Sequence, residues 1–308
     1  MSNPQPVDSM IYPRYSSIAT FFRLPHITDA NELDVAIVGI PFDGSAGYMA
    51  GPRYAPREIR ARSATIRPHN MQGVNPFEKH RVADYGDLST TPFSIKETFK
   101  RIQAGITHLL DNDVIPVSVG GDHGITLPVL RAIGKKHGPV ALIQIDSHPD
   151  THDSQFGHPE THATMLRRGI EENIVIPDKV ISIGLRGSLF YANDLQYGRD
   201  KGIRVIFPDE YQSRDPLDVK REIHEIIGDA KVYFTLDIDG IDPAFAPGTP
   251  VPEIGGLTSA NALQIIHSLE GLNIVGTDIC EVSPPVDNRN QITSVLAAQL
   301  IFEMLCVI

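Results

Sequence analysis

Short apolar runs alternate with longer amphipathic segments along most of the chain. The apolar runs are almost free of polar residues, which indicates strands buried on both faces. They lie at 34–40, 81–87, 114–122, 140–146, 179–185, 231–239 and 272–280, the second being the weakest. The amphipathic segments carry apolar residues three and four positions apart, as helices do. They lie at 96–113, 126–138, 215–227, 258–271 and 294–305. This alternation predicts a three-layer α/β/α fold with a mostly parallel, doubly wound sheet.

No linker, repeat or low-complexity segment interrupts this pattern, so we predict a single domain over residues 17–308. A chain of this length can bury a large core without disulfide bonds. Residues 1–16 are polar and rich in proline. We expect them to form an N-terminal arm that is ordered only if it packs on a neighbour.

The charge balance excludes some classes of partner. The formal net charge is -11, from 38 acidic and 27 basic residues. Nucleic acids and anionic membranes need a basic face, so neither is an expected partner, whereas a small cationic substrate is compatible with this charge. The two cysteines, Cys280 and Cys306, form no C-x-x-C motif. With no visible signal peptide or membrane-spanning run, we expect a cytoplasmic protein.

The residues that follow the predicted strands carry the candidate chemistry. Two histidines and four aspartates follow three of these strands: His123, Asp146, His148, Asp150, Asp237 and Asp239. The carboxyl ends of parallel strands meet at one edge of a sheet, where ligands bind in such folds. Four carboxylates with no counter-cation would be too costly to bury together. The set therefore predicts a site for two divalent metal ions with bridging carboxylates.

Each of these residues taken alone has a more ordinary interpretation. A single aspartate at a strand end more often caps the following helix. We interpret Asp122 and Asp242 in this way, as turn or supporting residues, and His158 as a loop histidine. The metal-site prediction depends on the coincidence of three such segments.

These segments resemble the agmatinase and guanidinobutyrase branch of the ureohydrolase family, which includes arginase. The resemblance runs from about Ser17 to the end of the chain. It is carried by GPRYAPREIR (51–60), GGDHGI (120–125), DSHPD (146–150), DIDGIDPAFAPGT (237–249), PEIGG (252–256) and EVSPP (281–285). It implies the arginase fold, a homo-trimer or hexamer, and hydrolysis of a guanidino compound by metal-activated water to urea and an amine. The six residues above would hold two Mn²⁺ ions, with Ni²⁺ as the alternative.

The resemblance also implies roles for three residues. Asp150, besides binding metal, would accept a proton from the attacking water. Glu281 matches the family's carboxylate that faces the guanidinium. His162, in THATMLRR, matches its proton-shuttling histidine. We therefore expect Asp150, Glu281 and His162 to be catalytic.

Several loop residues depart from the family pattern. Relatives have D-A-H where Ser147 stands, and GTGTPE where this chain reads GTPVPE at 248–253. Gly124 and Ala163 also differ from the residues that relatives have at these positions. Residues 47–50 lack an arginine that is common in this branch. We expect four residues to contact substrate at the pocket mouth: Tyr48, Met49, His152 and Pro250.

These departures favour a changed substrate. A desolvated carboxylate tail needs a cationic partner, and residues 47–50 offer none. The sequence thus favours an N-alkylated guanidine or a biguanide such as metformin, which would give guanylurea and an amine. One alternative is a guanidinobutyrase or agmatinase with drifted loops. Another is a weakly active or non-catalytic subunit that pairs with a paralogous subunit in a hetero-oligomer. A deacetylase of related topology would need a different ligand pattern.

Overall fold

The computed structural model of the protein describes residues 3–308, and its centre is an eight-stranded sheet. Every strand pair in it is parallel, in the order β2-β1-β3-β8-β7-β4-β5-β6. The strands are β1 (Val35–Ile40), β2 (Val82–Asp87), β3 (Ile115–Gly120), β4 (Val140–Ile145), β5 (Val175–Ile183), β6 (Arg204–Ile206), β7 (Lys231–Asp237) and β8 (Asn273–Cys280). The predicted α/β class is confirmed, and the sheet is parallel throughout.

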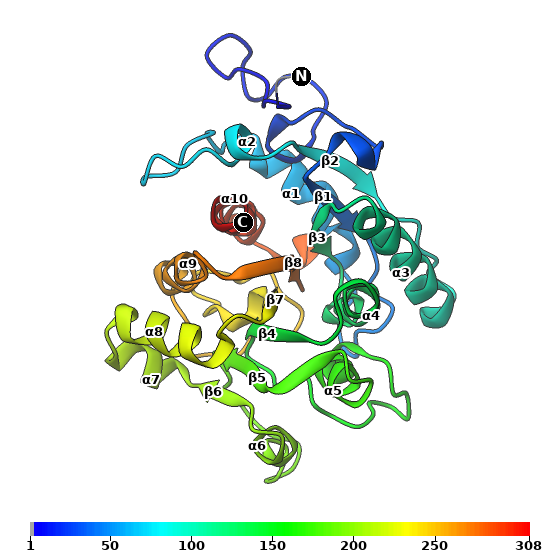
Figure 1. Ribbon diagram of the computed structural model, residues 1–308, viewed down its shortest axis with the longest axis vertical. Helices are drawn as coiled ribbons and strands as arrows, with labels where there is room; N and C mark the ends of the chain where they lie inside the picture. The colour runs from blue at the N-terminus through cyan, green and yellow to red at the C-terminus, as the bar shows by residue number, and fades with distance from the viewer. Residues whose placement is uncertain (1–2) are drawn as a thin grey trace.

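Helices cover both faces of the sheet, as Figure 1 shows. One layer contains α3, α4 and α5, and the other contains α1, α8, α9 and α10. The helices are α1 (Ala55–Ser63), α2 (Pro76–Lys79), α3 (Ile95–Asp111), α4 (Thr126–His137), α5 (Met165–Glu171), α6 (Gln196–Asp200), α7 (Pro208–Ser213), α8 (Pro216–Ile227), α9 (Ser259–Ser268) and α10 (Ile292–Val307). The N-terminal segment that the structure describes lies beside α2, and α6 lies at the opposite, β6 end of the sheet (Figure 1).

The strand β4 shows why the apolar runs are almost continuous. Val140 and Leu142 belong to the core beneath α3, α4 and α5, whereas Ala141, Ile143 and Ile145 belong to the core on the other face. Side chains alternate between the two faces of a strand. Because both faces are covered, every position except Gln144 is apolar, and the strand lacks the alternation of a half-exposed sheet.

The long periodic elements agree with the sequence prediction, and the short ones were missed. All seven predicted strands and five predicted helices are present within a few residues of their expected bounds. The strand β6 and the helices α1, α2, α5, α6 and α7 were not predicted, because they are short or rich in charged residues. Thr258 caps α9 in a capping box with Asn261. Among residues 3–308, no helix has the length and apolar character needed to cross a membrane.

The described part of the N-terminal arm packs against its own chain. The amide of Val7 donates to the carbonyl of Arg23 at 3.0 Å. The side chain of Gln5 donates to the carbonyl of Phe77 at 2.8 Å. These hydrogen-bonding partners of the arm come from the region of the same chain before β2.

Candidate metal centre and active site

The candidate site lies at the carboxyl ends of four strands, β3, β8, β7 and β4, which are consecutive in the sheet. His123 follows β3, Glu281 follows β8, Asp237 ends β7 and Asp146 follows β4. Asp237 is in register with Cys280 at the end of the neighbouring strand. The parallel topology thus brings four segments that are distant in sequence to one edge.

His123 faces three carboxylates in the first half of the site. Its Nδ1 lies 3.0 Å from Asp146 Oδ2, 2.9 Å from Asp150 Oδ2 and 3.4 Å from Asp237 Oδ2. All four residues are buried. Two ligand atoms about 2.1 Å from one octahedral ion lie about 3.0 Å apart when they are adjacent. The observed spacing is that of ligands around a shared ion.

The second half of the site is built on His148. Its Nδ1 lies 3.0 Å from Asp239 Oδ2 and 3.7 Å from Asp146 Oδ1. Asp146 therefore turns one oxygen toward each histidine. The ligand atoms form two groups that could each hold an ion, namely His123 with Asp146 and Asp237, and His148 with Asp146 and Asp239. The structure brings all six residues of the predicted ligand set together.

The hydrogen bonds of His123 identify the free nitrogen of its ring. Its Nε2 lies 2.8 Å from Thr235 Oγ1, and that hydroxyl lies 2.6 Å from Asp278 Oδ1. A carboxylate only accepts, so Thr235 donates to Asp278 and accepts from the Nε2–H of His123. Nδ1 is buried and has no hydrogen-bond partner among residues 3–308. A proton or a metal ion at this nitrogen would balance the carboxylates around it, and a metal ion fits the arrangement.

Because the cluster is buried, the pKa of each of its ionisable groups depends on the charges of the others. It raises the pKa of Asp146 to about 7, with the charges of Asp150 and Asp239 adding to the effect. Burial also raises the pKa of Asp237 well above its ordinary value. Although burial alone would lower the pKa of His123, the surrounding carboxylates raise it well above its usual range. The cluster therefore favours bound positive charge.

Two of the candidate functional residues have strained backbones. Asp150 has φ 49° and Glu281 has φ 60°, a left-handed region that non-glycine residues seldom adopt. The carbonyl of Asp150 is held by the amides of Leu166 and Arg167 at 3.2 and 3.3 Å, and the amide of Glu281 donates to Gly121 at 2.9 Å. Such strain persists where the surroundings enforce it, and it gathers at functional sites.

Supporting residues orient the ligand carboxylates, and the sequence analysis had assigned them no role. Gln144 Nε2 donates to Asp146 Oδ2 at 2.5 Å. Ser147 donates to Asp239 Oδ1 through its amide at 3.0 Å and through its hydroxyl at 2.7 Å. The departure from D-A-H at Ser147 therefore touches a candidate metal ligand directly. A polar residue inside an apolar strand, as in VALIQI, was the available signal for Gln144.

Asp278 organises the polar interior beneath His123. Its carboxylate is fully buried and accepts hydroxyl donors from Thr126 at 2.8 Å, Tyr233 at 2.6 Å and Thr235 at 2.6 Å. Its position in the apolar strand NIVGTDIC was the corresponding signal. A buried carboxylate that accepts three hydrogen bonds has its hydrogen-bonding capacity met, and it holds the three donor side chains in place.

Glu281 and His162 lie together, outside the two ligand groups. His162 Nδ1 is 3.4 Å from Glu281 Oε1, which also accepts the amide of His123 at 2.9 Å. Burial lowers the pKa of His162, but Glu281 outweighs burial and raises it to about 9. The amide of Gly47 donates to Nε2 at 3.2 Å, which requires Nε2 without a proton and therefore acts against the raised pKa. A guanidinium bound to Glu281 would weaken the interaction that raises this pKa.

A pocket of about 340 Å³ opens over the cluster. It is lined by His148, Asp150, Asp237 and His162 among the predicted metal-binding and catalytic residues. Two of the four predicted substrate residues line this pocket, and two do not. Tyr48 and His152 line it, whereas Met49 and Pro250 are not among the lining residues, and Val251 is.

The pocket wall is acidic, and its one arginine among the lining residues is engaged elsewhere. Glu253 and Asp194 line the wall together with Arg186. The Arg186 guanidinium donates to the backbone carbonyls of Asp239 at 2.7 Å, Gly240 at 3.0 Å and Glu253 at 2.6 Å. Arg186 therefore ties the backbone at Asp239 and Gly240 to the loop at Glu253. No motif in the sequence indicated this role for the arginine.

Aromatic side chains surround the pocket mouth. Tyr48, Phe156 and Phe190 line the pocket and are 77%, 85% and 79% exposed. His152 packs edge-on against Phe190 with ring centroids 5.7 Å apart. The rim thus presents apolar surface around an acidic interior.

Comparison with known proteins agrees with this architecture. A profile of the arginase family matches residues 33–306. The guanidinobutyrase of Pseudomonas aeruginosa is 45% identical over 310 residues, covering 99% of this chain and 96% of that protein. The guanidinopropionase of the same organism is 40% identical and covers 100% and 98%. The solved structure of proclavaminate amidino hydrolase from Streptomyces clavuligerus has a TM-score of 0.91 at 37% identity, covering 96% of this chain and 98% of that chain. By sequence and by fold, the chain belongs to the arginase family of C–N hydrolases.

Proposed function

We propose that the protein is a binuclear metal hydrolase that cleaves a C–N bond of a guanidino compound with water. The observation that carries this proposal is the pair of ligand groups sharing Asp146. Attack of water on the guanidinium carbon and departure of the amine would give urea from a simple guanidine, or guanylurea from a biguanide. The names of the guanidinobutyrase and guanidinopropionase relatives support this reaction class.

The ligand atoms divide naturally between two ions. His123, Asp146, Asp150 and Asp237 would hold one ion, and His148, Asp239 and the other oxygen of Asp146 would contribute to the second. When bound, the metals lower the pKa of a water molecule toward neutrality. Carboxylate-rich sites suit Mn²⁺, and Ni²⁺ is the alternative that elemental analysis would distinguish.

Three side chains of the protein would carry out the remaining steps of the reaction. Glu281, buried and close to His162, would orient the guanidinium and balance its charge. Asp150 would accept a proton from the attacking water. His162 lines the pocket and would carry a proton to the leaving amine.

The acidic wall supports a substrate without an anionic tail. Glu253 and Asp194 would repel a carboxylate, and Arg186 is committed to backbone carbonyls. The aromatic rim favours alkyl substituents. We therefore favour an N-alkyl guanidine or a biguanide such as metformin over 4-guanidinobutyrate. Agmatine, whose tail is an amine, is the alternative that the same acidic wall would accept.

Metal content is the first test of this proposal. Protein purified without chelator and supplied with Mn²⁺ or Ni²⁺ should contain close to two ions per chain by elemental analysis. Asp239→Ala should lose at least one ion and most activity. A content near zero under both loadings would contradict the binuclear site.

Substrate specificity is tested by kcat/KM for agmatine, arginine, 4-guanidinobutyrate, a dimethylated guanidine and metformin. We expect the guanidines without a carboxylate to match or exceed 4-guanidinobutyrate. A preference for guanidinobutyrate above about tenfold, or about 1.4 kcal/mol in transition-state binding, would instead support an ordinary guanidinobutyrase.

The quaternary state is a further part of the proposal. The family likeness supports a homo-trimer or hexamer, which light scattering would measure. Activity that appears only after mixing with a paralogous chain would instead support the non-catalytic or weakly active subunit of a hetero-oligomer.

A further inference from the structure

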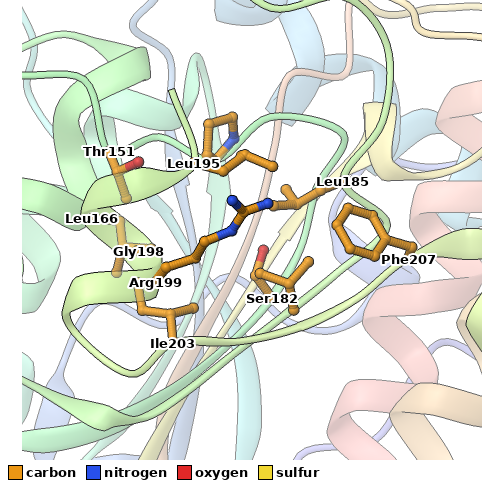
Figure 2. A pocket seen from close by; sticks show the side chains of 11 residues that line it. Thr151, Leu166, Ser182, Leu185, Leu195, Gly198, Arg199, Ile203 and Phe207 are labelled. Carbon is orange, nitrogen blue, oxygen red and sulfur yellow. The ribbon is translucent and has the colours of Figure 1, made fainter. Parts of the chain in front are cut away.

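A second, smaller pocket lies behind the segment that carries Asp150. It has a volume of about 130 Å³ and is bounded by the ends of β5 and β6, by α6, and by Pro149 and Thr151. Its walls are mostly apolar, with Leu185, Leu195 and Phe207 among them. Figure 2 shows these side chains arranged around the pocket. An engineered apolar cavity of about 150 Å³ holds benzene, so this pocket fits a ligand of about that size.

Two buried hydroxyls reach this pocket without partners. Ser182 is 1% exposed and Thr151 is 4% exposed. Neither hydroxyl has a hydrogen-bond partner among residues 3–308. Figure 2 shows both oxygens directed toward the space inside the pocket. A buried hydroxyl left without a partner is destabilising, so a ligand that accepts hydrogen bonds would relieve this penalty.

An arginine crosses the same space. The Arg199 side chain runs from α6 across the pocket, between Leu195 and Leu185 (Figure 2). In the part of the chain that the structure describes, its guanidinium forms no ion pair. It is therefore free to bind a planar anion through two parallel hydrogen bonds.

We propose that this pocket binds a short aliphatic carboxylate. The carboxylate would pair with Arg199 and accept from Ser182 and Thr151, and the alkyl chain would pack against the leucines and Phe207. A cationic ligand would be repelled by the guanidinium, and water alone would leave the apolar walls uncovered. Pro149 and Thr151 flank Asp150, so an occupant would restrain a segment that carries a proposed metal ligand.

The test uses butyrate as the probe and the Mn²⁺-loaded protein. Isothermal titration calorimetry should detect saturable binding, and the thermal midpoint should rise with the logarithm of butyrate concentration above Kd. Butylammonium chloride and sodium chloride at matched ionic strength should have neither effect. Absence of saturable butyrate binding by the wild type would overturn the proposal.

Three variants distinguish butyrate binding in this pocket from butyrate binding at the metal ions. Arg199→Met should weaken butyrate binding by about tenfold or more, because it removes a charged hydrogen-bond partner. Ser182→Ala should also weaken it, while leaving the ligand-free midpoint unchanged or higher, since it removes an unsatisfied hydroxyl. Arg57→Met is the control, because Arg57 is exposed on α1, far from α6 in Figure 1. Equal affinity in the wild type, Arg199→Met and Ser182→Ala would place butyrate elsewhere and overturn the assignment.

Discussion

Glu281 and His162 are the residues whose roles can be separated from metal binding by single substitutions. They contact each other, and neither belongs to the two groups of ligand atoms. Both come from segments outside the DSHPD and DIDGID motifs, and His162 lines the pocket. A change at either residue should therefore alter the reaction while the metal content persists.

Glu281→Gln should reduce kcat/KM by about thirtyfold or more, while leaving the metal content unchanged. Glutamine keeps an oxygen that can accept the amide of His123, but it loses the charge that faces the guanidinium. Breaking a buried charge pair costs about 2 kcal/mol or more. Steady-state kinetics and elemental analysis would measure both effects, with Asp237→Ala as the metal-losing reference. Equal metal loss in the two variants would contradict the proposed role of Glu281.

His162→Ala should retain both ions and lose turnover by about 10²–10⁴-fold, the range typical of a lost proton transfer. His158→Ala is the matched control. His158 is exposed in the same loop region and contacts the carbonyl of Glu160. Single-turnover kinetics on metal-loaded protein would compare the two variants. Full turnover in His162→Ala would show that His162 has no catalytic role.

At the scale of elements, residues on β7 and β8 hold His123 of the candidate metal site in place through hydrogen bonds. Thr235 and Tyr233 on β7 both donate to Asp278 on β8, but only Thr235 also contacts His123. The two strands therefore connect a ligand to a hydrogen-bond network within the sheet. Partners of this kind orient a ligand histidine and set its tautomer.

Thr235→Val should weaken metal affinity by about 10–100-fold, because His123 loses the acceptor that fixes its ring. Tyr233→Phe removes a different donor to Asp278 and should leave the affinity near that of the wild type. Metal titration of the chelator-treated variants would measure the difference, and thermal midpoints would account for stability. Equal losses in both variants would mean that the network acts on stability alone.

At the scale of the whole molecule, the candidate metal site concentrates negative charge inside the protein. Four aspartates with exposures of 4% or less surround two histidines at one edge of the sheet: Asp146, Asp150, Asp237 and Asp239. Ions that bind the folded chain more tightly than the unfolded chain stabilise the fold. The metal content should therefore affect global stability.

Chelation should lower the thermal midpoint, and Mn²⁺ or Ni²⁺ should restore it in a concentration-dependent way. Removing the ions leaves the carboxylates buried with only protons to balance them. Scanning calorimetry of native, chelated and reloaded protein would measure the shift. Asp239→Ala should respond less to reloading. An unchanged midpoint after verified metal removal would contradict this link.

The sequence determined the class of fold and the composition of the candidate metal site. Apolar runs such as 140–146 report burial on both faces, because a covered parallel sheet leaves no polar face. The DSHPD and DIDGID motifs each place several ligand-type residues within a few positions of one strand end. Both signals are local, so they can be seen in the sequence without knowledge of strand order.

Only the tertiary structure decided which distant residues support that cluster and line the pocket. Asp278 and Thr235 share a network because β8 and β7 are neighbours in the sheet. Arg186 reaches carbonyls at Asp239 and Glu253, a long-range contact that no local pattern encodes. Loop paths likewise put Val251 on the pocket wall in place of the expected Pro250. Hydrophobic periodicity specifies how an element is buried, whereas the packing of the elements decides which polar groups meet.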